Sequence, residues 1–331
     1  MKLPPLAVST GDPGGVGPQV ALQAAASCHD ARTLLFGDAH SLERMASEAG
    51  IDTQRLAPAD ALLGRIGIVD CGARWEGEAS AHRPTASGGV AQLAALEAAR
   101  AAVVAGQARA LVTAPMSKEA VTLGGHDFSG HTEHLARAAG LAADDVTMMF
   151  LGPRLRVALV TTHVAVAELP TAVTAARVAR ACRHLGEALV AMGDVSGDRV
   201  VVTGLNPHAG EGGLFGDDER RAIAPGVQDA SHALPYVGEG ALRLEGPQAA
   251  ETALRRAAAG EVAGVVAMAH DQATIASKLL DWGAAVNVTW GLPYVRTSVD
   301  HGVAYDAAAA GTADTEGMGA ALQMALRLTA R

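Results

Sequence analysis

The stretch Leu6-Ala-Val-Ser-Thr-Gly-Asp-Pro-Gly-Gly-Val-Gly-Pro18 indicates the fold class. Its first five residues form a short apolar run that predicts a buried strand. A glycine-rich turn follows, and Pro18 stands where proline suits the first turn of a helix. A strand that leads through a tight turn into a helix is the unit from which α/β proteins with parallel sheets are built.

The rest of the chain repeats this alternation. Segments with helical character are expected at 90–106, 171–192, 219–232 and 249–259. Short apolar runs lie between or beside them, at 34–36, 66–70, 110–113, 148–151, 157–161, 200–203 and 264–267. Near-continuous apolar strands of this kind are typical of largely parallel sheets that helices cover on both faces. A length of 331 residues suggests about two domains. We expect residues 1–121 and 286–331 to form one domain with both termini, and residues 122–285 to form the other.

Composition excludes several classes of protein. The 26 basic and 35 acidic residues give a net charge of −9, which argues against general binding to nucleic acid or to an anionic membrane surface. The three scattered cysteines make no disulfide framework and fit a reducing cytoplasm. No apolar run is long enough to span a membrane. We therefore expect a soluble, cytoplasmic, globular protein without a nucleic-acid or membrane partner.

The glycine-rich turn matches neither common phosphate-binding motif. No Gly-Lys-Ser/Thr follows it, and Val20 stands where a dinucleotide fingerprint would have its third glycine. Two interpretations stay open, a tight strand-to-helix turn and a close approach of a ligand to the backbone.

Two polar segments supply candidate donors to a phosphate or carboxylate. They are Thr113-Ala-Pro-Met-Ser-Lys118 and Ser129-Gly-His-Thr-Glu-His134. As the alternative, Ser129 or Thr132 caps a helix that begins near Glu133, and His134 covers the surface.

Three histidines each follow an apolar strand, namely His163, His208 and His270. A lone histidine in such a place is more often structural. Because parallel strands bring their carboxyl ends to one edge of a sheet, three of them predict a divalent-metal site with open positions.

Local positive charge comes from Lys278 and Arg296, with Asn287 between them, and these residues suit a phosphorylated substrate. As the alternatives to substrate binding, Lys278 is a surface lysine and Arg296 lies at a solvated strand end. The turn from Asp300 to Asp306 is either ordinary loop packing or an adenosine-binding loop.

Several motifs together resemble the 4-hydroxythreonine-4-phosphate dehydrogenase family of vitamin B6 biosynthesis. In addition to the segments above, they include Asn206-Pro-His-Ala-Gly-Glu211, His270-Asp-Gln272 and Gly291-Leu-Pro-Tyr-Val-Arg-Thr-Ser-Val-Asp-His-Gly302. The resemblance implies a two-domain fold like that of isocitrate and isopropylmalate dehydrogenases, with the active site in the interdomain cleft. It also implies a homodimer, NAD or NADP, and one divalent metal (Zn, Mg or Co) held across the dimer interface.

Site roles follow from the resemblance, position by position. Metal ligands are His163, His208 and His270; substrate contacts are His131, Thr132, Lys278, Asn287 and Arg296; the cofactor loop holds Asp300, His301, Gly302 and Asp306. Candidate catalytic groups are Lys278 for proton transfer, Asp271 to orient an imidazole, and Glu251, which stands where an active-site Asp is usual. Gln19, Ala269 and Ala273 also depart from the family pattern.

The expected activity is oxidation of 4-phosphooxy-L-threonine by NAD(P)+, followed by decarboxylation to 3-amino-2-oxopropyl phosphate, in pyridoxal phosphate biosynthesis. One alternative is a related dehydrogenase for threonate or erythronate 4-phosphate, or for an aromatic cis-dihydrodiol. Another is a non-redox three-histidine metal hydrolase.

Overall fold

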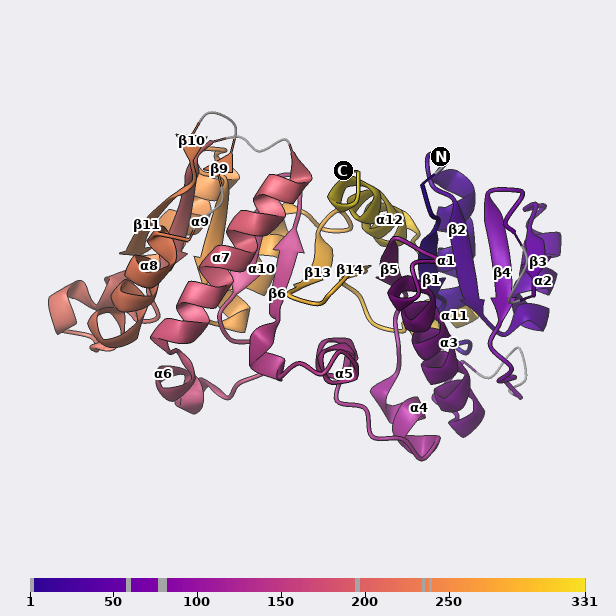
Figure 1. Cartoon of the computed structure of the whole chain (residues 1–331). Coiled ribbons are helices and arrows are strands. Elements are labelled where there is room, and N and C mark those ends of the chain that lie inside the picture. Colours follow the sequence, from indigo (N-terminus) through magenta and orange to yellow (C-terminus); the bar gives the residue numbers. More distant parts are fainter. Residues whose placement is uncertain are drawn as a thin grey trace. The chain divides into compact units, whose positions relative to one another are not determined.

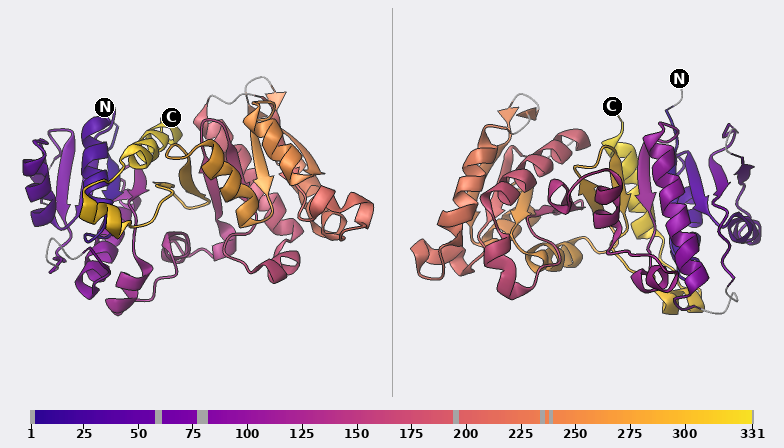
Figure 2. Two further views of the ribbon diagram at one scale, coloured as in Figure 1. Left: turned by 180° about the vertical axis from the view of Figure 1, so that it is seen from behind. Right: turned by 60° about the horizontal axis from the view of Figure 1, so that its bottom comes forward.

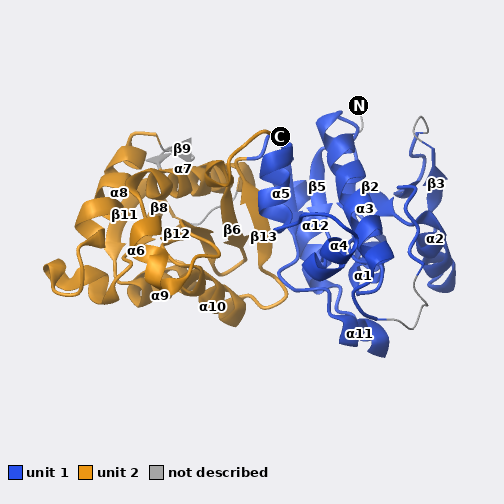
Figure 3. Ribbon diagram, turned by 90° about the horizontal axis from the view of Figure 1, so that it is seen from below, with its two compact units in different colours: residues 1–139, 292–331 blue, residues 140–291 orange. Residues whose placement is uncertain are grey.

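The computed structural model describes residues 3–57, 61–76, 82–193, 197–233, 236–237 and 240–330. The chain divides into two compact units, with unit 1 made of residues 1–139 and 292–331, and unit 2 of residues 140–291 (Figure 3). Both termini belong to unit 1, where the helix nearest the carboxyl end contacts the first helix of the chain (Figure 2). The division falls at 139/140 and 291/292, whereas the sequence suggested 121/122 and 285/286.

Unit 1 contains a parallel sheet with the strand order β3-β4-β2-β1-β5-β14 (Figure 1). The central strand β1 is fully buried, as expected where helices cover both faces of a parallel sheet. The strands are β1 (Leu6–Ser9), β2 (Thr33–Gly37), β3 (Gln54–Leu56), β4 (Ile66–Asp70), β5 (Ala110–Thr113) and β14 (Val295–Ser298).

Two groups of helices pack on this sheet. α1 contacts α2, α12 and β2, whereas α3 contacts α4, β1, β2 and β5. Thr85 caps the amino end of α3 by accepting a hydrogen bond from the Gly88 amide at 3.0 Å. The helices are α1 (Gly17–Ser27), α2 (Ala39–Glu48), α3 (Ala86–Val104), α4 (Lys118–Leu123), α5 (His131–Ala138), α11 (Tyr305–Ala310) and α12 (Glu316–Leu328).

Unit 2 contains a mixed sheet with the order β11-β8-β12-β7-β6-β13. The first four strands are parallel, but β6 is antiparallel to both β7 and β13. The strands are β6 (Thr147–Leu151), β7 (Arg156–Leu159), β8 (Arg199–Thr203), β11 (Arg243–Gln248), β12 (Gly264–Ala267) and β13 (Val286–Trp290). Two further strands, β9 (Tyr236–Val237) and β10 (Gly240–Ala241), pair antiparallel in a separate sheet.

The helices of unit 2 also form two groups. α7 and α8 pack together, and α9 contacts α10, while both groups contact strands of the sheet. Thr174 caps α7, and Gly193 ends it in a left-handed conformation with φ of 73°. The helical segments are η1 (Ala143–Asp145), η2 (Val166–Glu168), α6 (Leu169–Ala172), α7 (Ala175–Met192), η3 (Pro207–Gly213), η4 (Glu219–Ile223), α8 (Ala224–Ser231), α9 (Ala250–Ala258) and α10 (His270–Leu280).

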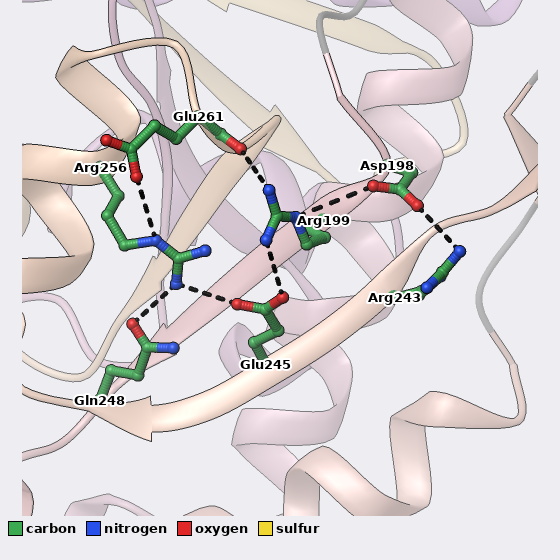
Figure 4. Close-up of polar contacts among 7 residues, drawn as sticks. All are labelled: Asp198, Arg199, Arg243, Glu245, Gln248, Arg256 and Glu261. Atoms are coloured by element: carbon green, nitrogen blue, oxygen red, sulfur yellow. Dashed lines mark hydrogen bonds and ion pairs between the residues drawn. The ribbon is translucent and has the colours of Figure 1, made fainter.

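A network of ion pairs fastens β11, which lies at one end of this strand order, to β8 and α9 (Figure 4). Glu245 at its centre lies 2.9 Å from Arg256 and 3.3 Å from Arg199. Because Arg199 is 41% exposed, water screens its pair with Glu245, and each such pair contributes at most about 1 kcal/mol. Charged side chains on an end strand also disfavour pairing with other chains.

The expected α/β class with mostly parallel, helix-covered sheets is confirmed. Among the residues that the structure describes, no helix is both long and apolar enough to cross a membrane.

Candidate functional site

Two of the three histidines predicted to bind metal lie together in unit 2. His163 follows β7, and His270 begins α10 just after β12. These strands are paired in parallel, with Leu159 opposite Ala267, so their carboxyl ends reach the same edge of the sheet. The imidazole rings have centroids 5.7 Å apart. Two imidazoles that share a tetrahedral ion have centroids about 5 Å apart, because each metal–nitrogen bond is about 2.0–2.1 Å. The pair therefore fits a divalent ion that accepts nitrogen ligands.

Asp271 contacts the ring of His270. Nδ1 of His270 lies 2.8 Å from Oδ1 of Asp271. A carboxylate at Nδ1 favours the tautomer that is protonated there and leaves the lone pair on Nε2 for a metal. This contact is the one that an orienting role for Asp271 requires.

His208, the third predicted ligand, lies in a loop with an unusual backbone. Residues 208–212 all have positive φ, although three of the five are not glycines, and such conformations cost energy. The buried carboxylate of Glu219 holds the start of this loop by accepting hydrogen bonds from the backbone amides of Leu205 at 2.9 Å and Asn206 at 2.8 Å. The His208 side chain itself is exposed.

No group of three or more His, Cys, Asp or Glu side chains is arranged to hold a metal within the described part of this single chain. The chain thus brings His163 and His270 together, but it does not complete a three-ligand site with His208. The assignment of all three as ligands stays a prediction.

Unit 1 holds the predicted substrate contacts His131, Thr132 and Arg296. The first two form the start of α5, and Arg296 lies in β14 with 2% of its surface exposed. Its Nε and Nη2 donate to Oγ1 of Thr113, at 3.2 and 2.7 Å. Burial lowers the pKa of Arg296 to about 10, so the guanidinium stays charged at neutral pH.

His131 presents a nitrogen that has no protein partner in the described part of the chain. Its Nε2 is buried and makes no hydrogen bond there. Burial holds the pKa of His131 well below its usual value, and its neighbours Arg296, His134 and Lys118 lower it further. A neutral imidazole among cations is suited to donate a hydrogen bond to an anion. Lys118 was absent from the predicted site, although its place in the 113–118 motif was a signal for it.

His134 does more than cover the surface, as one interpretation of the sequence had it. Its side chain is 18% exposed, and Nε2 lies 2.6 Å from Oε1 of Glu97 in α3. Arg100 donates from Nε and Nη2 to the other oxygen of Glu97, at 2.9 and 2.7 Å. The hydrogen bond with His134 and the contacts with Arg100 lower the pKa of Glu97 to about 2. This cluster anchors α5, with its predicted substrate contacts, to α3.

The other predicted substrate contacts and catalytic groups lie in unit 2. Lys278 is in the last turn of α10, with Nζ 5.8 Å from the centre of the Trp282 ring. Oδ1 of Asn287 in β13 is buried and has no hydrogen-bond partner among the described residues. Glu251 is exposed in the first turn of α9. The roles predicted for them remain predictions.

The glycine-rich turn packs against other loops of unit 1. A Cβ on Gly11 would lie 2.2 Å from the carbonyl oxygen of Pro115, and one on Gly15 would lie 2.1 Å from Cγ1 of Val303. The Val16 amide donates to the Val303 carbonyl at 3.0 Å. Atoms of neighbouring loops therefore occupy the space that these glycines leave, which supports the interpretation of this segment as a tight turn.

The predicted cofactor loop lies on the surface of unit 1. His301, Gly302 and Asp306 are exposed, and Asp300 is partly buried. The loop leads into α11, whose first residue Tyr305 donates to Oδ2 of Asp12 at 2.7 Å. Sequence reasoning singled out the segments on both sides of this contact but not the contact itself.

Comparison with known proteins identifies the family. Residues 29–325 match the family described as pyridoxal phosphate biosynthetic protein PdxA. A 4-hydroxythreonine-4-phosphate dehydrogenase of Geobacter metallireducens is 40% identical and aligns over 98% of this chain and 95% of its own length. A protein of Oceanobacillus iheyensis, provisionally named a D-threonate 4-phosphate dehydrogenase, is 36% identical over 99% of this chain and 98% of its own. The crystal structure of a 4-hydroxythreonine-4-phosphate dehydrogenase from Burkholderia phymatum superposes with a TM-score of 0.80 at 35% identity, covering 100% of both chains.

The family match covers most of the chain, and the named relatives are dehydrogenases. The resemblance seen in the sequence motifs is therefore confirmed. This chain belongs to the PdxA family of pyridoxal phosphate biosynthetic proteins and is an oxidoreductase.

Proposed function

We propose that the chain oxidises 4-phosphooxy-L-threonine with NAD+ or NADP+ and that the resulting β-keto acid loses CO2 to give 3-amino-2-oxopropyl phosphate. The observation that carries this proposal is the pair of imidazoles of His163 and His270, 5.7 Å apart at the ends of two parallel strands. The metal would be Zn, Co or Mg; imidazole nitrogen suits the first two better. When bound, it would supply Lewis-acid stabilisation of negative charge on the substrate oxygen during hydride transfer and decarboxylation.

The residues of unit 1 supply recognition of the phosphate. Arg296 and Lys118 bring positive charge, and the neutral ring of His131 offers a hydrogen bond. Thr132 adds a hydroxyl at the start of α5, where backbone amides also attract anions. A chain with a net charge of −9 needs such a local concentration of donors to hold a dianion.

Unit 2 supplies the groups for the reaction itself. Asp271 holds the ring of His270 in the tautomer that binds metal. Lys278 would transfer the proton, or clamp the phosphate or carboxylate, and Glu251 and Asn287 would complete the site. In unit 1, the loop with Asp300, His301, Gly302 and Asp306 would bind the adenosine side of the nicotinamide cofactor.

We further propose that two copies of the chain form a homodimer that shares its metal sites. The exposed face of α10 and the turn after it carry Ile275, Leu279 and Trp282, which are 59%, 80% and 77% exposed. Exposed apolar side chains gathered on one helix and its following turn favour an interaction surface. Because α10 begins at His270, a second copy on this face would come close to the incomplete metal site.

Pairwise mixing of inactive variants tests the sharing. The variants His163→Ala, His208→Ala and His270→Ala are mixed in pairs. If the three ligands of one site come from two protomers, activity should recover in two of the three mixtures, because each of those mixed dimers contains one intact site. The pair that fails to recover marks the two ligands from the same protomer. Failure of all three mixtures after verified subunit exchange would show that each site is built from one chain.

The metal assignment is tested by the single variants. Each histidine-to-alanine substitution should abolish NADH formation and lower the bound metal content, while the circular dichroism spectrum stays that of the wild type. Near-normal activity of two variants after chelation and dialysis would refute a site made from these residues.

A second candidate substrate is D-threonate 4-phosphate, because the Oceanobacillus iheyensis relative is named for it. Both compounds carry the phosphate that His131, Lys118 and Arg296 would bind. They differ at the carbon next to the carboxylate, which bears an amino group in one and a hydroxyl in the other.

A further inference from the structure

Asp12 of the glycine-rich turn is a buried carboxylate that three parts of unit 1 contact. Its side chain is 1% exposed. Oδ1 accepts a hydrogen bond from the Gly14 amide at 2.9 Å, and Oδ2 accepts from Nε2 of Gln92 at 3.2 Å and from the Tyr305 hydroxyl at 2.7 Å. Removing a carboxylate from water is costly unless donors replace the water. These donors come from the turn itself, from α3 and from α11.

The hydrogen bonds continue from Asp12 to the 113–118 segment. Gln92 is fully buried, and its Oε1 accepts from the Ser117 amide at 2.8 Å. Ser117 in turn caps α4 through the Ala120 amide at 3.1 Å. The backbone supports the same arrangement, since the Asp12 amide donates to the Pro115 carbonyl at 3.0 Å. One buried network thus joins three segments that the sequence singled out separately.

The contact with Tyr305 is important for the loop that precedes it. α11 has six residues, none of them fully buried, and its first turn has no side-chain cap. The residue before it, Ala304, has a φ of 47°, in the left-handed region that disfavours alanine. A short, exposed helix with a strained entry depends strongly on the anchors that it has, and the hydrogen bond from Tyr305 to Asp12 is one of them.

We propose that Asp12 is a positioning residue for the cofactor: by holding Tyr305 it fixes the loop 300–306 in the conformation that binds the nicotinamide dinucleotide. The inference rests on the proposed function, which assigns this loop to NAD(P). This role would account for a buried carboxylate inside a turn whose Gly11 and Gly15 make room for neighbouring loops. The Tyr305 hydroxyl acts through loop geometry and does not touch the reacting atoms.

The test compares Tyr305→Phe with the wild type by calorimetric titration of NAD+ and NADP+. Loss of this buried hydrogen bond predicts that the Kd of the preferred dinucleotide rises by about 5- to 20-fold. The kcat at saturating dinucleotide should stay within about twofold, because the chemistry is untouched. Asp12→Asn should weaken dinucleotide binding in the same direction, and the double variant should lose less than the product of the two single losses.

Tyr294→Phe is the matched control, because the buried Tyr294 hydroxyl has no hydrogen-bond partner among the described residues. It should leave the Kd of the dinucleotide unchanged. Should Asp12→Asn fail to fold, Tyr305→Phe alone decides.

Wild-type Kd in Tyr305→Phe would overturn the proposal, as would a loss of kcat and thermal stability with Kd unchanged, which is the result of a purely structural role. If the wild type binds neither NAD+ nor NADP+, the proposed function fails first and this inference fails with it.

Discussion

Replacing Arg296 by lysine tests whether this buried guanidinium recognises the phosphate. The substitution keeps the positive charge but removes the planar fork whose Nε and Nη2 both donate to Thr113. Lysine has a single nitrogen, so it cannot hold Thr113 and bind a phosphate with the same geometry. Loss of a charge-assisted hydrogen bond costs about 1–3 kcal/mol, which corresponds to roughly a 5- to 150-fold fall in kcat/KM.

Burial adds a pH dependence to this effect. The surroundings that lower the pKa of Arg296 from 12.5 to about 10 would also lower the pKa of a lysine there, which starts from about 10.4. Because burial disfavours the charged form, the lysine would lose its proton at a lower pH than the arginine. The deficit of Arg296→Lys should therefore grow as the pH rises above neutral, while the wild type keeps its charge.

The assay is kcat/KM for 4-phosphooxy-L-threonine and for its dephosphorylated analogue, in both proteins at two pH values. The loss should be confined to the phosphorylated compound, and the affinity for NAD+ should stay unchanged. Arg137→Lys, on the same unit with a side chain 64% exposed, is the control and should behave as wild type. Equal losses for the two compounds would show that Arg296 does not recognise the phosphate.

Glu97 has a folded-state pKa of about 2, below the 4.5 of the unfolded chain, so its contribution to stability is full above about pH 4.5 and is lost as the pH falls toward 2. At 37% exposure this contribution is about 1 kcal/mol. Urea unfolding should show Glu97→Gln less stable than the wild type at pH 7, with a smaller difference at pH 3 and almost none at pH 2. Asp281→Ala should lower the free energy of unfolding by about 2–3 kcal/mol, because it strips the Leu155 amide of a buried partner at 2.9 Å. Glu219→Ala should lower the free energy of unfolding by a similar amount, and it should also weaken metal binding because it releases the strained loop that carries His208. A calorimetric metal titration that gives wild-type affinity would contradict the second effect.

The sequence predicts the strands better than their arrangement. β4, β5 and β12 have the expected bounds, because the polar turns on either side of a short apolar run determine where the strand begins and ends. The antiparallel pairing of β6 with β7 was not foreseen, although only residues 152–155 separate them. A parallel connection needs a dozen or more residues, so that spacing was the available signal.

Contacts across long sequence separations explain what the sequence could not show about the site. Asp12 and Tyr305 are 293 positions apart, and His134 and Glu97 are 37 apart. No local pattern links such residues, because the strand order alone brings them together. The apposition of His163 and His270 was inferable only from the general rule that parallel strands end at one edge of a sheet.

NADH or NADPH absorbance with a panel of substrates tests whether the chain catalyses a metal- and NAD(P)-dependent oxidation of 4-phosphooxy-L-threonine. The panel comprises this compound, D-threonate 4-phosphate, their dephosphorylated forms and an aromatic cis-dihydrodiol, each with and without added Zn²⁺, Co²⁺ or Mg²⁺ after chelation. We expect reduction of the dinucleotide only with metal present, the highest kcat/KM for 4-phosphooxy-L-threonine, and release of CO2. A preference for D-threonate 4-phosphate would change the assigned substrate, whereas no dinucleotide reduction with any compound would refute the proposed oxidation.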